Sequence, residues 1–162
     1  MPLYASAAAE INWLIGLISE VRSVRSEMNV PAGAMVPLSV SGAYADTLDR
    51  LRTHDVVIKR LARSDAITHA DMPLSGAVQV LVGEATLSLP LAGVIDLKAE
   101  RARLDREADR IRKEIAKIDA KLGNEQFMAK AKEEVIEEQR DRRDDYIALL
   151  ARTEAAVARL PE

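Results

Sequence analysis

Apolar residues recur every three or four positions across residues 10–28, and this spacing predicts a helix. The apolar positions form two rows, which together cover well over half of the helix circumference. One neighbouring element rarely buries so wide a surface, so we expect this helix to belong to a bundle larger than the chain itself supplies. The two rows are Ile11, Leu14, Ile15 and Ile18, and Trp13, Leu17, Val21, Val24 and Met28.

A helix stop and a strand follow this helix. Pro31 comes after Val30 and before Gly33, a sequence that ends helices. Residues 34–42 then alternate apolar and small or polar side chains, as a strand does. Pro37 lies inside this stretch and cannot donate a hydrogen bond to a neighbouring strand, so we expect an edge strand.

The next segments predict short elements of both kinds. Residues 43–52 and 55–64 have helical spacing and predict one or two short helices, and residues 66–71 predict a short strand. The apolar side chains of the helical stretches that we expect to point inward are Leu48, Leu51, Val57, Ile58 and Leu61.

The clearest sheet pattern lies in residues 77–91. Apolar residues alternate along both halves of this stretch, and Gly83 and Glu84 between them suit a tight turn. The stretch therefore predicts a β-hairpin, and residues 31–93 predict a small α+β unit of three or four strands.

From Asp96 onward the spacing of apolar residues becomes four, three, four, three, which is the heptad pattern of a coiled coil. Gly123 and Asn124 tolerate the backbone that ends a helix, so we expect the chain to fold back there. The first series is Leu97, Arg101, Leu104, Ala108, Ile111, Ile115, Ile118 and Leu122. The second is Val135, Gln139, Arg142, Tyr146, Leu149, Thr153, Ala156 and Leu160.

These patterns predict the α+β class, with a small sheet and one or two helices preceded by a long helix and followed by a long antiparallel coiled-coil hairpin. The expected divisions are residues 1–30, the last helix of a truncated helical bundle; residues 31–93, the α+β unit; and residues 94–162, the coiled-coil arm.

Composition narrows the functional classes. The chain has 162 residues, no cysteine and a net charge of −3. The missing cysteines exclude disulfides and thiol chemistry, and the charge argues against sequence-independent nucleic-acid binding by the whole surface. The sequence has no apolar run long enough for a membrane span and no basic leader, so we expect a cytoplasmic protein without membrane contact.

No catalytic or metal-binding set stands out. His54 and His69 share no ligand spacing, and His54 beside Asp55 suits a helix boundary. The sequence shows no Ser/His/Asp set, glycine-rich phosphate loop or carboxylate pair. We therefore expect no catalytic residue, no metal and no cofactor in this chain.

One basic row stands out on the first helix of the arm. Its members recur every three or four residues and are Arg103, Arg106, Arg110, Lys113, Lys117 and Lys121. With the seam as assigned, the first five face away from the second helix, with acids displaced to a flank. An ordinary solvated surface with weak local ion pairs would explain the row, and so would an edge that faces phosphates.

Three stretches carry a resemblance to a known family. Residues 11–38, "INWLIGLISEVRSVRSEMNVPAGAMVPL", resemble the end of the anticodon-binding domain of bacterial valyl-tRNA synthetases. "GVIDLKAERARL" and "KLGNEQFMAKAKEEVIEEQR", at residues 93–104 and 121–140, resemble the C-terminal coiled-coil arm of the same enzymes.

The resemblance implies that the chain is a non-catalytic tRNA-binding part of an enzyme that uses ATP to join valine to its tRNA. The expected partners are valine-specific tRNA, contacted at its outer corner, and the remaining domains of the enzyme. ATP would belong to those domains, and the chain itself is expected to be a monomer. The residues expected to contact tRNA are Arg22, Arg25, Arg103, Arg106, Arg110, Lys113, Lys117, Lys121 and Lys130.

The residues also allow a different class of function, a coiled-coil module that dimerises or docks a protein partner. An apolar outer row would favour it, and Ile147, Leu150 and Val157 are the residues that hint at one.

Overall fold

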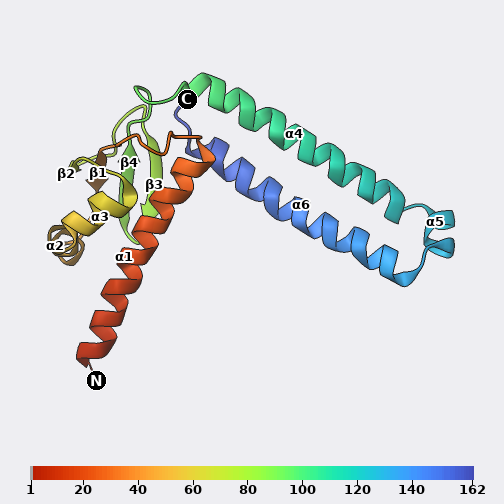
Figure 1. Ribbon diagram of the computed structural model, residues 1–162, viewed down its shortest axis with the longest axis horizontal. Coiled ribbons are helices and arrows are strands. Elements are labelled where there is room, and N and C mark those ends of the chain that lie inside the picture. Colours follow the sequence, from red (N-terminus) through yellow and green to blue (C-terminus); the bar gives the residue numbers. More distant parts are fainter. Residues whose placement is uncertain (1) are drawn as a thin grey trace. The chain divides into compact units, whose positions relative to one another are not determined.

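The computed structural model describes residues 2–162. The chain divides into two compact units. The first unit runs to Glu100 and also contains Arg159–Glu162, and the second unit is Arg101–Ala158. The helices and strands of the structure confirm the predicted α+β class (Figure 1). They are α1 (Pro2–Glu27), β1 (Leu38–Ser41), α2 (Ala45–Thr53), α3 (Asp55–Ala62), β2 (Ile67–His69), β3 (Val78–Val82), β4 (Ala85–Leu89), α4 (Leu97–Leu122), α5 (Glu125–Lys130) and α6 (Glu133–Arg159).

Helix α1 is longer than its apolar rows predicted, because the alanine-rich residues before Glu10 are strong helix formers. One of its faces is buried, whereas Ile11 and Ile15 remain 47% and 57% exposed. Asn29 ends the helix in the left-handed conformation, with φ of 54°. The buried face consists of Leu14, Leu17, Ile18, Val21, Val24 and Met28.

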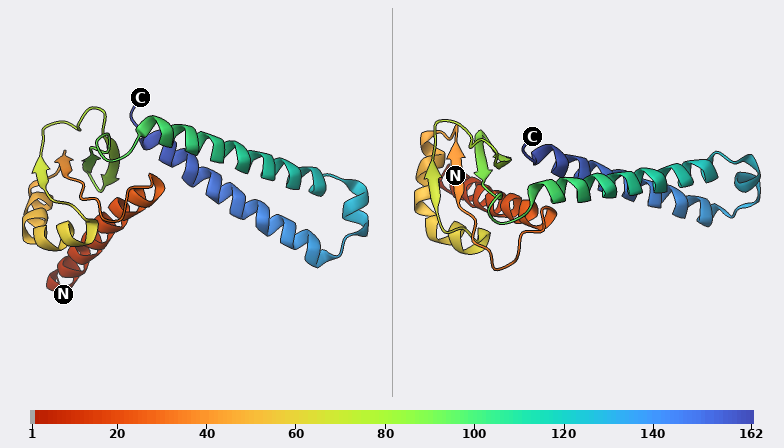
Figure 2. Two further views of the ribbon diagram at one scale, coloured as in Figure 1. Left: turned by 45° about the horizontal axis from the view of Figure 1, so that its top comes forward. Right: turned by 90° about the horizontal axis from the view of Figure 1, so that it is seen from above.

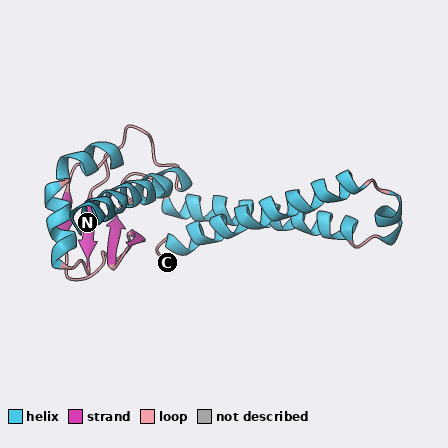
Figure 3. Ribbon diagram, turned by 90° about the horizontal axis from the view of Figure 1, so that it is seen from below, coloured by secondary structure: helices cyan, strands magenta, loops and turns pink. Residues whose placement is uncertain are grey.

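The four strands form one mixed sheet in the order β2-β1-β4-β3. β1 and β2 are parallel and are joined through α2 and α3, and the other pairs are antiparallel. Figure 3, in which helices are cyan and strands magenta, shows α1 along one side of the sheet. The buried apolar residues of the strands, most of which alternate with polar ones, include Leu38, Val40, Val78, Val80, Leu87 and Leu89.

The other face of the sheet carries buried serines on its two central strands, β1 and β4. Ser39, Ser41 and Ser88 are each at most 5% exposed. The Ser88 hydroxyl accepts a hydrogen bond of 3.1 Å from the Leu74 amide, so the segment before β3 lies against this part of the face. Serine suits this position because its hydroxyl satisfies backbone groups that an apolar side chain would leave unpaired.

The predicted hairpin is present, but the prediction of an edge strand at Pro37 is wrong. β3 and β4 are joined by Gly83 and Glu84, with Gly83 at φ of 58°. β1 lies inside the sheet, between β2 and β4. Its pairing begins only at Leu38, whose amide donates to the Ala66 carbonyl at 2.8 Å, so Pro37 withholds no hydrogen bond from the sheet.

Two short helices occupy residues 45–62, and the prediction of which of their residues face inward is partly wrong. Leu51 and Ile58 are buried as predicted, but Val57 and Leu61 are 41% and 47% exposed. The helical path breaks at His54, which rotates α3 so that Ile58 and Ala62, four residues apart, face the core instead.

Arg25 connects three segments of the first unit. Its side chain is only 7% exposed, and its guanidinium donates to the carbonyls of Pro31, Ala34 and Arg63 at 3.1, 2.7 and 3.4 Å. Burial, and to a smaller extent the charge of Arg63, lowers the pKa of Arg25. Arg25 therefore ties the end of α1 to the following loop and to the end of α3.

Glu84 connects the β3–β4 turn to the start of α2. Its Oε1 accepts hydrogen bonds from the Tyr44 amide at 3.1 Å and the Thr47 hydroxyl at 2.6 Å. The hydrogen bond from Thr47 lowers the pKa of Glu84. Tyr44 is the N-cap residue of α2, but its side chain makes no capping hydrogen bond. The carboxylate of Glu84, which is distant in sequence, caps the helix instead.

Helices α4 and α6 form the predicted antiparallel hairpin; they run side by side in the left view of Figure 2 and cross at a small angle in the right view. Two ion pairs also join them: Arg112 Nη2 lies 2.7 Å from Glu154 Oε1, and Arg143 Nε lies 2.5 Å from Asp119 Oδ1. The buried residues of the hairpin are Leu104, Ala108, Ile111 and Ile118 from α4, and Ile136, Gln139, Thr153 and Ala156 from α6.

The distal half of the α6 seam differs from the prediction by one residue. Ile136 is buried and Val135 is 39% exposed, and Arg142 is exposed, whereas Arg143 reaches Asp119. Burying the larger isoleucine removes more apolar area from water, and a buried Arg142 would lose its hydration without a partner. At the tip, the Asn124 side chain caps α5 by accepting from the amides of Gln126 and Phe127.

Replacing Arg25 by methionine should destabilise the first unit by about 3 kcal/mol, because three inward-facing carbonyls lose a charged donor. Urea unfolding followed by the fluorescence of Trp13, which lies in this unit, measures the change. Arg22→Met is the matched control, because Arg22 is exposed three residues away. Equal stability of the two variants would contradict the role given to Arg25.

Replacing Glu84 by alanine should cost about 1 kcal/mol at neutral pH, the usual value of a helix cap. Because folding lowers the pKa of Glu84, its contribution is complete above the unfolded pKa of about 4.3 and disappears as the pH falls through the folded pKa. Urea unfolding at neutral and acidic pH should show the wild type and Glu84→Ala converging in acid. A gap that is constant with pH would rule out the charged cap.

Candidate nucleic-acid interface

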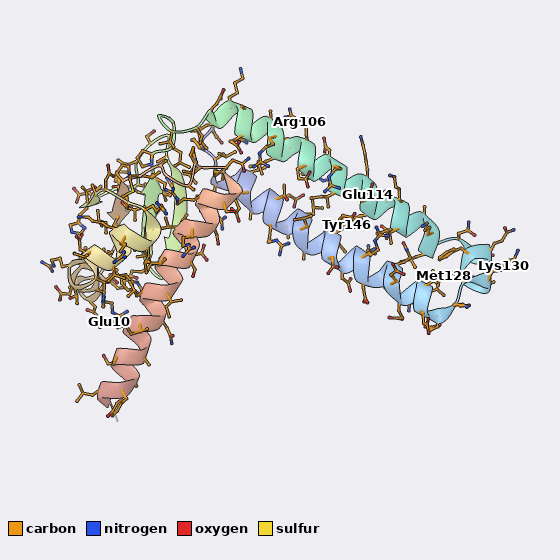
Figure 4. All side chains as sticks on the ribbon, viewed as in Figure 1. Glu10, Arg106, Glu114, Met128, Lys130 and Tyr146 are labelled. Carbon is orange, nitrogen blue, oxygen red and sulfur yellow. The ribbon has the colours of Figure 1, made fainter. Side chains whose placement is uncertain are left out.

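The basic row of α4 includes two cations that project freely into solvent. Arg106 and Lys113 are both exposed, and neither side chain has a hydrogen bond or ion pair with any residue in the described part of the chain. They lie roughly 140° and 160° around the helix from the buried Ile111, at 3.6 residues per turn. Figure 4 shows Arg106 on α4, on the side away from α6.

Other members of the row turn toward the flank, which corrects the expectation that the first five face away from α6. Arg110 donates to Glu107 through Nε and Nη2 at 3.0 and 2.7 Å, and Glu107 raises the pKa of Arg110. The Tyr146 hydroxyl on α6 adds a smaller effect in the same direction, so Arg110 lies at the border of the two helices.

Lys117 repeats this arrangement two turns further along. Its Nζ lies 2.9 Å from Glu114 Oε1, and Lys117 lowers the pKa of Glu114. Arg103 is half-buried and engaged in interactions of its own. Both interpretations of the basic row therefore apply to part of it. The cations on the flank are locally paired, and those on the outer side are unpaired.

The expected cations near the tip are both exposed. Lys121 lies in the last turn of α4. Lys130 lies in the last turn of α5 (Figure 4). Neither contacts an acid within residues 2–162.

The structure adds α6 residues to the basic flank that the sequence did not assign. Arg142, Tyr146 and Arg152, with Asp145 and Leu149, line a shallow groove of about 320 Å³. Arg142 also lowers the pKa of Glu114 on α4, so this groove borders the flank that carries Arg110 and Lys117. The sequence-based prediction missed Arg142 because the heptad spacing placed it in the seam between the helices. The charge of its side chain argues against burial there.

The opposite side of α6 is acidic. Glu134, Glu137, Asp141 and Asp144 are exposed, and Glu137 accepts a hydrogen bond from Arg140 at 2.8 Å. The outer side of α4 thus exposes the unpaired cations Arg106 and Lys113, and the outer side of α6 exposes a row of acids. A polyanion would meet the α4 side and be repelled by the α6 side.

The two arginines expected in the first unit have different environments. Arg22 is exposed, whereas the Arg25 guanidinium is occupied by three carbonyls. Only Arg22 has a side chain that a ligand can reach without disrupting the fold.

The histidines form no competing site within the described residues. His54 Nε2 lies 3.7 Å from Glu10 Oε2, and His69 lies on β2. Within residues 2–162 no group of histidines and carboxylates could hold a metal ion, and no helix is long and apolar enough to cross a membrane.

Comparison with known proteins gives the arm a family. Residues 96–161 match the family described as the valyl tRNA synthetase tRNA binding arm. Valine–tRNA ligase of Brucella suis is 52% identical over 84% of this chain, and that of Agrobacterium fabrum is 46% identical over 97%. The ligase of Granulibacter bethesdensis is 47% identical over 98% of the chain.

The chain spans only 15% to 18% of the length of these relatives. The matches include the two stretches of the arm on which the resemblance rested. The chain therefore belongs to the family of valyl-tRNA synthetases, and residues 96–161 are the segment that the family describes as its tRNA-binding arm.

Proposed function

We propose that this chain binds tRNA through the outer basic side of α4, as a non-catalytic part of a valine–tRNA ligase. The observation that carries the proposal is the pair Arg106 and Lys113, exposed and unpaired in the part of the chain that the structure describes, within the tRNA-binding arm of the family. Lys121 and Lys130 extend the surface toward the tip, and Arg110 and Lys117 line its flank.

This chemistry suits folded RNA. RNA helices are recognised mainly by shape, through phosphates and 2′-hydroxyl groups, and lysine and arginine side chains on a straight helix supply such contacts. Each phosphate contact displaces counterions, so binding should weaken as salt rises. The outer corner of the tRNA, valine specificity and the ATP-dependent reaction are part of the same proposal, and ATP would act in domains of the ligase outside this chain. A cytoplasmic location follows from that role.

The locally paired cations contribute less to this surface. Arg110 and Lys117 already share carboxylates, so an RNA phosphate would have to compete with Glu107 and Glu114. Arg25 is left out of the proposed surface, because its donors are used inside the fold.

Replacing Arg106 and Lys113 by alanine should weaken tRNA binding roughly tenfold at low salt and reduce the slope of log K against log salt by about two. Both side chains are exposed, so the hairpin should keep its helicity. Filter binding of the chain with tRNA at about 50 and about 200 mM salt measures the effect.

Arg140→Ala is the control for Arg106→Ala. Arg140 is an exposed arginine of the same arm, but it lies on α6 and is paired with Glu137. The two substitutions remove the same charge. If only the overall charge mattered, both would weaken tRNA binding equally, whereas a contact on α4 predicts weaker binding for Arg106→Ala alone. Equal binding by both variants would refute this interface.

The exposed apolar face of α1 supports the expected continuity with the rest of the ligase. Leu3, Tyr4, Ile11 and Ile15 are between 47% and 84% exposed. We propose that residues 1–30 belong to a larger helical domain whose other helices cover this face, and that the chain is a monomer. A coiled-coil module that dimerises remains the alternative, and a second copy could cover the same face.

Sedimentation equilibrium over a concentration series distinguishes a monomer from a dimer in which a second copy covers this face of α1. The chain should sediment as a monomer, and Ile11→Ser combined with Ile15→Ser should leave its mass and stability unchanged, because both residues are exposed. A dimer that the double substitution dissociates would identify the face as a self-association surface instead.

A further inference from the structure

Four arginines line one hollow of the first unit. The hollow has a volume of about 410 Å³ and lies between the end of α1, the loop after it and the end of α3. Its lining contains no acidic and no aromatic residue. The residues that line it are Arg22, Arg25, Ser26, Val30, Ala32, Arg60, Leu61 and Arg63.

The guanidinium groups at the rim are free to take a ligand. Arg22, Arg60 and Arg63 are exposed, and none of their side chains donates a hydrogen bond or forms an ion pair within residues 2–162. The neighbouring cations differ in this respect, because Lys59 pairs with Asp55 at 2.9 Å and Arg52 with Asp49 at 2.5 Å. The unpaired arginines of this region thus gather around the hollow.

Arg25 adds a fixed positive charge beneath the rim. Its partners are three backbone carbonyls, which orient the guanidinium but do not neutralise it as a carboxylate would. Four like charges without a counter-charge in the lining repel one another, and an anion in the hollow relieves that repulsion.

The fold fixes the position of this rim. Arg63 is the C-cap of α3 in the left-handed conformation, with φ of 52°. Its carbonyl accepts from Arg25 and from the Val36 amide, the latter at 3.1 Å. The backbone below the hollow is thereby held by hydrogen bonds from α1 and from Val36, two residues before β1, so the site is largely formed before a ligand arrives.

We propose that this hollow binds phosphodiester groups of RNA, with Arg22, Arg60 and Arg63 as the contacting residues. Planar guanidinium groups bind phosphate oxygens in bidentate fashion, which suits arginine better than lysine here. A hollow lined without aromatic rings gives no stacking surface for a base, which favours backbone contact over recognition of a free nucleotide. The proposal rests on the proposed tRNA-binding function and gives it a second contact surface, outside the arm.

The test compares two doubly substituted chains that carry the same change of charge. Arg60→Gln with Arg63→Gln removes two rim cations, and Arg52→Gln with Lys59→Gln removes two paired cations of the same unit. The first should weaken tRNA binding roughly tenfold and lower the salt slope by about two, and the second should leave both nearly unchanged. Fluorescence anisotropy with labelled tRNA at two salt concentrations gives both quantities.

A local measurement covers the case in which the substituted chain misfolds. In the unaltered chain labelled with ¹⁵N, the side-chain Nε–H signals of Arg22, Arg60 and Arg63 should shift on addition of tRNA, and that of Arg52 should not. Equal binding by the two variants, or unshifted rim signals in a chain that binds tRNA, would overturn this site and leave the arm interface standing. A chain that binds no tRNA would overturn both.

Discussion

The seam between α4 and α6 is the constraint on which the proposed interface depends. Leu104, Ile111 and Ile118 are each at most 6% exposed, and burying a side chain of this size contributes roughly 1.5–3 kcal/mol. Their burial fixes the rotation of α4 about its axis. That rotation leaves Arg106 and Lys113 on the outside, and brings Glu107 and Glu114 to the flank where they pair with Arg110 and Lys117. A rotation by one residue would mix these two groups of cations.

In the first unit, Arg25 has a comparable role. Its guanidinium holds the ends of α1 and α3 and the loop between α1 and β1 in one arrangement. Using a cation for this purpose concentrates positive charge, since Arg22, Arg60 and Arg63 surround the same hollow. A neutral donor would hold the carbonyls with less repulsion, so the charge itself points to a ligand of opposite sign. Neighbouring arginines that look equivalent in the sequence thus differ in the structure: Arg25 is occupied inside the fold, and the exposed ones carry the proposed binding role.

Both proposed surfaces rely on cations that lack a partner inside the chain. Exposed ion pairs are worth little to stability, so a pair such as Lys117 and Glu114 can form or break at small cost. Unpaired cations gain more from a phosphate, because no carboxylate has to be displaced. The net charge of −3 does not prevent such binding, since the acids of α6 lie on another side of the arm from Arg106 and Lys113.

The sequence by itself determined the kinds of element and the pairing of the two long helices. Heptad spacing and the Gly123–Asn124 helix end suffice for a hairpin, and strand alternation with Gly83 suffices for the β3–β4 turn. Only the tertiary structure decided which neighbours each element meets: the central place of β1, the burial of Ile136 instead of Val135, and the different environments of Arg22 and Arg25. The physical reason is that periodicity reports what one segment can bury, whereas a hydrogen bond from Arg25 to Arg63, 38 residues away, depends on where the chain returns.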